Sequence, residues 1–491
     1  MKNADEIYKE IYDGNIYPIT GYTLDEIRLR PVYSEVLPHD VDVSVKLGKV
    51  KMNIPLLSAA MDTVTAEKMA QAMFEVGGCG IIYRHKRPEV QFEWIEKTLA
   101  HKPCLVSDPM TLSPEHVLDD AKDILENYGY STIPIVDNKK ILLGILFTKD
   151  VAFSGREDDS VQKWMIPFNQ LKVESNSTPF EKIQERLLNE NDCTLLPVVN
   201  DQKCLQGVYF MKDMLNIQPV YYNDKPLVGM AIGVNNDDIE RAKEGIKAGV
   251  GMIVIDSSHG SCPSVIDQAK RIVSISNKQA NVIAGNITDI DGYLKLAEVG
   301  VDAVKIGIGC GATCTTSTVT GVGMPLFTLL RELSYTRNLL KKAGKNAPVI
   351  IPDGGMDSTG NMVVALAAGG HACMSGVMFV SATESISYQK NGSFDGYVAY
   401  RGMASKGAIL SRSSDRYGKQ KKAPEGEEGM VEFRGPVKTW IGGTVEWIKG
   451  GFSHVGAKNL ADLHEIGEKG MSFVRFTGFG KDQINVRMKR D

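Results

Sequence analysis

The residue type best suited to covalent chemistry is a cysteine, Cys314, in the glycine-rich stretch GIGCGATCTTSTVTG (307–321), where Thr315 and Thr316 follow it. A thiolate in such a loop can add to an electrophilic carbon and form a covalent intermediate. The spacing alone leaves a simpler interpretation open, in which Cys314 is a packing residue and the glycines turn the chain. A metal pair of Cys310 and Cys314 is a weaker alternative, because no companion ligands stand at metal-binding spacing.

Other polar residues and glycines also stand directly after short apolar runs. An aspartate such as Asp353 can accept hydrogen bonds from two vicinal ribose hydroxyls. Glycines such as Gly355 and Gly376 let a phosphate approach bare backbone amides. Asp-Gly-Gly by itself is equally compatible with a tight turn. The complete set is Asp62, Arg84, His85, Asp256, Ser257, Ser258, Asn286, Asp353, Gly354, Gly355 and Gly376.

Eight Val- and Ile-rich runs carry these residues and alternate with segments of helical periodicity. Eight such units predict an α/β fold, a (β/α)8 TIM barrel, whose active site lies at the carboxyl ends of its strands. An open doubly wound sheet is the competing architecture, but no run is followed by GxGxxG with an acidic residue about 20 positions on. The expected strands lie within residues 54–62, 78–85, 227–235, 252–260, 281–286, 303–309, 348–355 and 372–379.

Helices are expected within 65–76, 237–249, 289–300 and 358–369, and several of these segments end in a glycine that suits a C-cap. After the last run comes a polar stretch, 400–437, with six glycines and no sustained apolar periodicity. Long stretches of this kind are usually functional lids or disordered. We therefore expect this stretch to serve the site.

An internal repeat interrupts the barrel after its second helix. The stretch TIPIVDNKKILLGILFTKDV (132–151) returns as LLPVVNDQKCLQGVYFMKDM (195–214), so that Pro134 and Pro197 are 63 residues apart. Each copy predicts an amphipathic helix, two β-rich runs joined by a polar turn, and a Lys-Asp that opens another helix. The module resembles a pair of cystathionine β-synthase (CBS) domains, regulatory units that commonly bind adenine or guanine nucleotides. Phe147 and Phe210 stand where that family often has a nucleotide-contacting Thr.

Composition excludes several classes of protein. The 491 residues carry a formal net charge of -4, which gives no general attraction to nucleic acid or anionic membrane. No apolar run approaches the roughly 20 residues that span a bilayer, and the N-terminus has no signal-peptide pattern, so we expect a soluble cytoplasmic protein. The eight cysteines are scattered without CxxC pairs, which argues against a disulfide framework or a zinc module.

Taken in order, the motifs resemble those of the IMP dehydrogenase family over essentially the whole chain. They are SAAMDTVT (58–65), the CBS insertion, DSSHG, AGN, GIGxGxxCTT, DGG, YRGM, SSDRY and PEGEEG. The resemblance implies barrel segments at 1–100 and 219–491 and a tandem CBS module at 101–218. It also implies oxidation of IMP to xanthosine monophosphate (XMP) with NAD, through a covalent thioimidate on a cysteine, in guanine nucleotide biosynthesis.

The same resemblance assigns roles to residues. Cys314 would be the nucleophile, Arg416 would activate water with Tyr417 beside it on a mobile flap, and Thr316 and Glu425 would support water activation and base recognition. Asp256, Ser257, Ser258, Gly307, Ile308 and Gly309 would face NAD, and carbonyls of Gly309, Gly311 and Cys314 would bind potassium. The remaining substrate-binding positions would be Met61, Asn286, Ala312, Asp353, Gly354, Gly355, Gly376, Val377, Tyr400, Gly402, Met403, Ala404 and Glu425.

Several positions depart from the family pattern. Ala312 and Val377 stand where serines usually bind the phosphate, and such charge-assisted hydrogen bonds contribute about 1.5 to 3 kcal/mol each. Ala404 replaces a flap glycine, and Cys310 replaces the usual Pro or Ser. The C-terminal GFGKDQINVRMKRD lacks the usual tail, with which a neighbouring subunit completes the cation site in the family.

Three alternatives remain open on the sequence. GMP reductase shares the barrel, the Cys-Thr loop and the Glu, but commonly lacks the Arg-Tyr pair found here at 416–417. A diverged paralogue with altered phosphate recognition would fit the two missing serines, and a non-catalytic nucleotide sensor would use only the CBS pair. As partners we expect a nucleotide substrate, a regulatory nucleotide at the CBS module, and copies of the chain itself in a tetramer that can pair into an octamer, with neither nucleic acid nor membrane.

Overall fold

The structure is a computed structural model that describes residues 2–12, 20–128, 130, 132–147, 156–190, 193–214, 217–411, 423–469 and 472–476. The chain divides into two compact units. One unit comprises residues 1–101 and 218–491, and the other comprises residues 102–217.

The larger unit is a closed barrel of eight parallel strands. A parallel bridge between Asp353 and Met374 joins the first and last strands of the sheet and closes it. The eight strands predicted from the sequence are all confirmed, and so is the barrel. In spatial order they are β18 (Val349–Pro352), β17 (Ala303–Ile306), β16 (Asn281–Ile287), β15 (Met252–Asp256), β14 (Gly229–Ile232), β5 (Cys79–Ile82), β4 (Leu56–Ser58) and β19 (Cys373–Ser375).

Alternate residues of each strand face opposite sides of the barrel wall, as the two-residue period of a strand requires. In β15, Met252 and Val254 lie in the interior core, whereas Ile253 and Ile255 lie in the core between strands and helices. The hairpin of β2 (Val45–Leu47) and β3 (Val50–Met52) adds apolar side chains to the interior core. Its turn contacts Asn281 at the start of β16, so it closes the amino-terminal end of the barrel.

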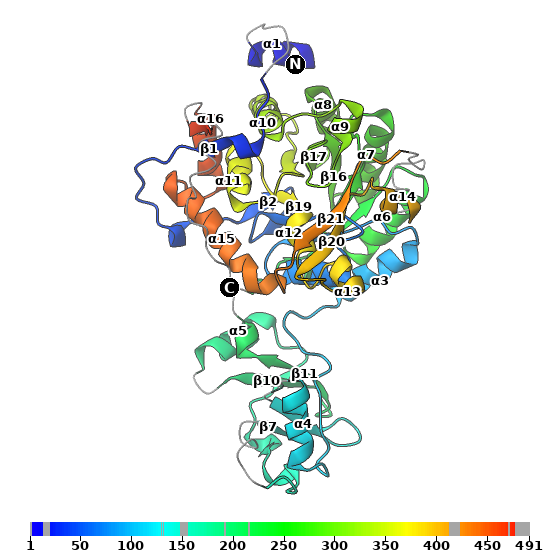
Figure 1. Cartoon of the computed structure of the whole chain (residues 1–491), viewed down its shortest axis with the longest axis vertical. Coiled ribbons are helices and arrows are strands. Elements are labelled where there is room, and N and C mark those ends of the chain that lie inside the picture. The colour runs from blue at the N-terminus through cyan, green and yellow to red at the C-terminus, as the bar shows by residue number, and fades with distance from the viewer. Residues whose placement is uncertain are drawn as a thin grey trace. The chain divides into compact units, whose positions relative to one another are not determined.

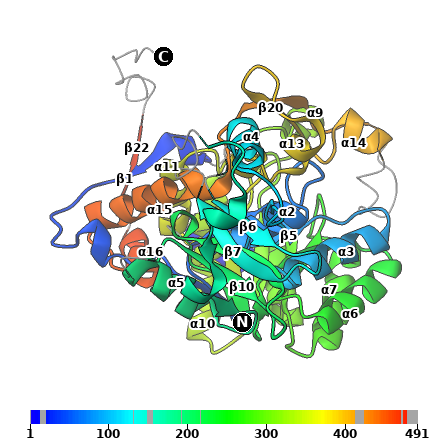
Figure 2. The same ribbon diagram turned by 90° about the horizontal axis from the view of Figure 1, so that it is seen from below.

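Helices surround the barrel strands, with α6 (Asp237–Ala248) and α7 (Pro263–Ser276) on one side (Figures 1 and 2). On the other side lie α11 (Thr359–Ala367), α15 (Val437–His454) and α16 (Leu460–Glu468). Gly249 and Gly300 cap α6 and α8 in the left-handed conformation, as predicted. The helices that follow the strands are α2 (Glu67–Glu75), α3 (Pro88–Leu99), α6 (Asp237–Ala248), α7 (Pro263–Ser276), α8 (Ile290–Val299), α9 (Thr316–Thr320), α10 (Leu326–Lys342), α11 (Thr359–Ala367), α12 (Val377–Val380), α13 (Ile386–Asn391), α14 (Lys406–Leu410), α15 (Val437–His454) and α16 (Leu460–Glu468).

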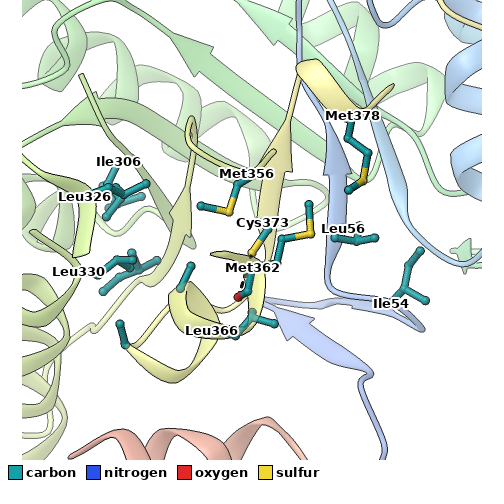
Figure 3. Close-up of a cluster of buried hydrophobic side chains, with 14 of the residues drawn as sticks. Ile54, Leu56, Ile306, Leu326, Leu330, Met356, Met362, Leu366, Cys373 and Met378 are labelled. Atoms are coloured by element: carbon teal, nitrogen blue, oxygen red, sulfur yellow. Dashed lines mark hydrogen bonds between the residues drawn. The ribbon is translucent and has the colours of Figure 1, made fainter. Parts of the chain in front are cut away.

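The core between strands and helices holds the strands in place. Figure 3 shows the part where α10 and α11 meet β17 and β19, with Met362 accepting a weak hydrogen bond from Cys373 Sγ through its carbonyl at 3.9 Å. Each fully buried Leu or Ile there stabilises the fold by about 1.5–3 kcal/mol. The labelled side chains are Ile54, Leu56, Ile306, Leu326, Leu330, Met356, Met362, Leu366, Cys373 and Met378.

Short elements flank the barrel. Helix α1 (Ala4–Ile11) begins the chain, and β1 (Ile27–Leu29) pairs with β22 (Phe473–Arg475). After β19, the antiparallel pair of β20 (Tyr397–Arg401) and β21 (Glu428–Glu432) brackets residues 402–427. The pair β12 (Tyr221–Tyr222) and β13 (Lys225–Pro226) precedes β14. Within the described residues, no helix is both long enough and apolar enough to cross a membrane.

The smaller unit contains two copies of one motif. The first copy has α4 (Leu118–Tyr128) and the hairpin of β6 (Thr132–Val136) and β7 (Leu142–Phe147), to which β8 (Ile166–Pro167) adds. The second has α5 (Phe180–Asn189) and the hairpin of β10 (Leu195–Val199) and β11 (Leu205–Phe210), beside β9 (Glu174–Ser175). Asp213 ends a three-residue 3-10 helix rather than opening an α-helix, and Lys149 and Asp150 lie outside the described residues.

The two hairpins of the smaller unit have the same register. Ile135 pairs with Gly144 in one, and Val198 pairs with Gly207 in the other, which are the same positions of the repeat. Ile141 forms a bridge with its own counterpart, Cys204. Because equivalent residues pair with each other, the two copies meet about an approximate twofold axis.

Candidate functional site

A cavity opens at the carboxyl ends of the barrel strands. Its lining includes every residue predicted for catalysis, substrate, cofactor or cation binding that the structure describes. The lining residues come from the ends of β4, β15, β16, β17, β18 and β19, from the Cys314 loop and from segments 400–404 and 425–426. Arg416 and Tyr417 lie outside the described residues.

Three polar residues at strand ends do not line this cavity. Arg84 donates to Asp238 at 2.6 Å and to Asp237 at 3.2 Å, which makes it a structural ion pair at the start of α6. Asp62 pairs with Arg401 of β20. His85 accepts a hydrogen bond from the Arg87 N–H, and burial lowers its pKa.

The Cys314 side chain begins a short chain of polar groups. Its Sγ donates to Thr316 Oγ1 at 3.3 Å, and that hydroxyl donates to Glu425 Oε2 at 3.1 Å. A proton on sulfur therefore has a two-step route to a carboxylate. This relay of Cys314, Thr316 and Glu425 is an arrangement for activating a thiol or a water molecule.

Backbone hydrogen bonds hold the nucleophile loop in register. The Cys314 N–H donates to the Gly311 carbonyl at 3.0 Å, which makes a tight turn. The Thr315 N–H donates to the Glu425 carbonyl at 3.1 Å, and the Glu427 N–H donates to the Thr313 carbonyl at 2.9 Å. The loop and segment 425–427 thus form a small backbone ladder, which fixes the Glu425 side chain relative to Cys314.

A buried lysine joins two carboxylates across the floor of the cavity. Lys305 Nζ lies 3.0 Å from Asp256 Oδ1 and 2.5 Å from Asp353 Oδ2, and Lys305 is only 4% exposed. Asn286 Nδ2 donates to the same Asp353 oxygen at 3.1 Å and to the Gly307 carbonyl at 2.7 Å. Burial alone would lower the pKa of Lys305, but the two carboxylates outweigh it and raise that pKa.

The period of the strands explains why these charges meet. Asp256 follows the inward residues Met252 and Val254, Lys305 follows inward Ala303, and Asp353 follows inward Ile351. Gly285 of β16 pairs with both Asp256 and Lys305. A Cβ at Gly285 would clash with the Lys305 carbonyl oxygen, so glycine is required between the two charged residues.

Lys305 is the functional residue that the sequence analysis missed. The signal was present, because a lysine within the apolar run AVKI (303–306) is either on a solvent-facing strand or buried and paired. Lys305 stands an even number of residues after an inward-facing residue of its strand, and so do Asp256 and Asp353 in theirs. All three side chains are therefore expected to point into the barrel. The other lining residues not singled out as site residues are Ala59, Ala60, Met356, Met374, Ser375 and Gly426.

Cys310 has a different environment from Cys314. Its Sγ donates to the Asp353 carbonyl at 3.4 Å, and burial, with the Asp353 charge, raises its pKa to about 12. It is a thiol at neutral pH and packs against the Gly307 and Gly354 turns. The sulfurs of Cys310 and Cys314 thus make separate contacts, which disfavours the metal-pair alternative.

The end of the cavity near β19 has the geometry for an anionic group. Gly376 has no room for a side chain, because a Cβ would lie 2.5 Å from Tyr400 Oη and 2.7 Å from Met61 Sδ. Tyr400 is buried, and that burial raises its pKa, so its hydroxyl stays protonated and can donate. Thr313 hydrogen-bonds to Tyr400 and stands next to Ala312.

Fold and site together define a (β/α)8-barrel enzyme with a cysteine loop and two carboxylates in one cavity at the carboxyl ends of its strands. The chain belongs to the IMP dehydrogenase / GMP reductase family, whose domain model matches residues 21–486. The resemblance seen in the motifs is therefore confirmed.

Individual relatives carry both names of the family. The chain is 36% identical to inosine-5′-monophosphate dehydrogenase of Aquifex aeolicus over 484 residues, 95% of each chain. It is 36% identical to that of Bacillus subtilis over 471 residues, 94% of each. Among solved structures it is similar to a GMP reductase variant from Trypanosoma brucei, with a TM-score of 0.74, 26% identity and coverage of 96% of this chain and 99% of that one. The same variant in complex with guanosine 5′-monophosphate gives a TM-score of 0.67 at 28% identity, with coverage of 96% and 98%.

Proposed function

We propose that this protein oxidises IMP to XMP with NAD as the hydride acceptor. The observation that carries the proposal is the relay from Cys314 through Thr316 to Glu425, in a cavity that also holds Asp256 and Asp353. Full-length relatives named IMP dehydrogenase support the same reaction.

The relay accounts for formation and hydrolysis of a covalent intermediate. The Cys314 thiol gives its proton to Thr316, which passes its own to Glu425, and the sulfur bonds to C2 of the hypoxanthine ring. Bound NAD would accept the hydride that leaves C2. The resulting thioimidate then takes up water at C2, and the C–S bond breaks to release XMP and restore the thiol.

Water activation has two candidate groups. Arg416, with Tyr417, is proposed as the water-activating pair, although an arginine acts as a base only in a desolvated and preorganised site, because its ordinary pKa exceeds about 12. Thr316 and Glu425 provide a second route, since Glu425 Oε2 already accepts a hydrogen bond from Thr316.

The nucleotide would lie across the cavity with its phosphate near β19. Asp353 and Asn286 would accept hydrogen bonds from the ribose hydroxyls, because the Asn286 Nδ2 group already donates to Gly307 and Asp353 and its buried Oδ1 has no partner within the described part of the chain. The amides of Gly354, Gly355, Gly376 and Val377 with Tyr400 would bind phosphate. Met61, Ala312, Gly402, Met403, Ala404 and Glu425 would surround the rest of the nucleotide.

The remaining part of the cavity suits NAD and a cation. Asp256, Ser257, Ser258 and the turn at 307–309 would contact the nicotinamide riboside. Carbonyls of Gly309, Gly311 and Cys314 would bind potassium, and Gly311 would use the lone pair that Cys314 N–H leaves free.

GMP reductase activity is the second candidate, favoured by the similarity to the Trypanosoma brucei structures. One assay separates the two, by following nicotinamide absorbance with IMP plus NAD and then with GMP plus NADPH. Turnover of the first pair supports the proposal. Turnover of the second pair alone would replace it.

The smaller unit is proposed to be a tandem CBS module that binds a regulatory nucleotide. Two hairpins of one register, joined through Ile141 and Cys204, support this assignment. Assembly as a tetramer that can pair into an octamer is proposed on the same family basis. Titration of the protein with adenine and guanine nucleotides tests nucleotide binding. Sedimentation of the same samples tests whether the chain forms a tetramer or an octamer.

A further inference from the structure

A second polar cavity lies at the amino-terminal end of the barrel, opposite the candidate active site. Its walls are one face of α10, one face of α16, and His371, which stands just before β19. Its volume of about 200 Å³ is below the roughly 300–1,000 Å³ of pockets that enclose drug-sized ligands. It is therefore sized for a small group and not for a whole dinucleotide.

Arg337 lines this cavity and forms no ion pair within the part of the chain that the structure describes. It is only 8% exposed, and its Nε donates to the Pro348 carbonyl at 3.2 Å. Its two terminal nitrogens have no hydrogen-bond or ion-pair partner among the residues that the structure describes, and they are open to the cavity and not fully buried. The planar fork of a guanidinium that opens to a cavity matches an oxyanion with two hydrogen bonds.

Further donors converge on the same place. His371 is 8% exposed, and its Nδ1 accepts from the Ile350 N–H at 3.4 Å, so its Nε2 carries the proton in the neutral ring. Lys341 lies one turn of α10 beyond Arg337. Burial, and next the nearby Arg337 charge, lower the pKa values of both His371 and Lys341, and the Glu468 carboxylate offsets part of this effect at Lys341.

The acidic residues of the cavity already have polar partners. Glu468 accepts from Asn338 at 2.7 Å, and Glu465 lies 3.5 Å from Lys469. Both are exposed residues at the rim. His464 is likewise engaged, because its Nε2 donates to the Gly370 carbonyl at 2.8 Å. The buried end of the cavity therefore presents the hydrogen-bond donors of Arg337 and His371.

We infer that this cavity is a binding site for a small oxyanion of the phosphate class, held by Arg337, His371 and Lys341. The anion would link α10 to the segment before β19. At this end of a barrel a ligand acts on stability and not on the chemistry, which takes place at the opposite end. The site is independent of the function proposed for the other cavity.

Equilibrium dialysis with labelled inorganic phosphate tests the site on the full chain. Saturating IMP blocks the active site, and a parallel arm replaces inorganic phosphate with ribose 5-phosphate to learn whether the ligand is the free ion or a phosphate monoester. We expect one bound phosphate per chain with IMP present. Arg337→Met should weaken it about tenfold or more, and Lys341→Gln by a smaller factor.

Lys342→Gln is the matched control, because this neighbouring lysine does not line the cavity. It should bind phosphate as the wild type does, and all three variants should keep the wild-type KM for IMP. If Arg337→Met does not fold, phosphate binding by Lys341→Gln decides the test, because Lys341 is exposed and its replacement should not affect folding. No phosphate binding to the wild type under IMP, or equal binding by the wild type and both cavity variants, would overturn the inference.

Discussion

Lys305 Nζ lies 3.0 Å from Asp256 Oδ1, within a cluster in which the same ammonium also bonds to Asp353. These two aspartates are the residues that we propose to bind the two riboses. One buried cation therefore sets the charge and position of both proposed ribose-binding carboxylates. This lysine is therefore part of the site, although it lies in the floor of the cavity beneath the two carboxylates.

Removing the lysine should damage both stability and binding. Lys305→Met leaves two carboxylates without their cation and should lower the free energy of unfolding by about 3–5 kcal/mol. Lys305→Arg keeps the charge and serves as the control. Urea unfolding measures the first effect, and the KM values for both substrates should rise together in Lys305→Met. A rise in the KM for only one substrate would contradict the inference that Lys305 positions both aspartates.

The same cluster predicts a pH dependence of stability. The folded-state pKa of Lys305 is raised, so its contribution is complete below its ordinary pKa of about 10.4 and is lost as the pH rises through the folded-state value. The wild type should therefore lose more stability than Lys305→Met as the pH rises above about 10.4. Parallel unfolding curves for the two proteins over that range would argue against a buried ion pair.

Replacement of the nucleophile should abolish turnover without unfolding the protein. Cys314 is half-buried, so Cys314→Ala removes little packing. Mass spectrometry of the wild type with IMP and NAD should show a nucleotide adduct on Cys314, and Cys310→Ala should retain that adduct. An adduct on Cys310 would move the nucleophile and refute the assignment.

Replacement of Arg416, which we propose to activate water, should separate hydride transfer from hydrolysis. Arg416→Ala should still give a burst of NADH about equal to the active sites, followed by a steady rate lower by about 10² to 10⁴. The thioimidate should accumulate. A reductase hydrolyses no such intermediate, so an unchanged steady rate from IMP would speak against Arg416 as the water-activating group.

The phosphate end of the cavity should respond to restored hydroxyls. Ala312→Ser combined with Val377→Ser adds two donors beside Gly376 and Tyr400, and should lower the KM for IMP about tenfold or more. Inosine, which lacks the phosphate, should be a poor substrate for both proteins. Equal use of inosine and IMP by the wild type would favour a diverged paralogue.

The strands and most of the cavity were predictable because both follow from local patterns. A Val- and Ile-rich run that ends in polar residues specifies a barrel strand and the position of its active end, as 252–260 does for Asp256. Lys305 was missed because its role depends on residues in two other strands. Arg84 and Asp62 stand at strand ends, but pairing with Asp238 and Arg401 directs them elsewhere. Which partner a polar side chain at a strand end binds depends on tertiary contacts, and a local sequence pattern does not contain that information.

The backbone ladder between the Cys314 loop and segment 425–427 has a consequence for how this enzyme can change over evolution. Ser405 forms a bridge with Gly426, so the chain leaves the site at 405 and returns to it beside the same residue. Loops whose two ends are fixed close together tolerate insertions and deletions at small entropic cost. Selection can therefore vary the length of the intervening stretch around Arg416 and Tyr417 while Thr313, Cys314 and Glu425 keep their relative positions.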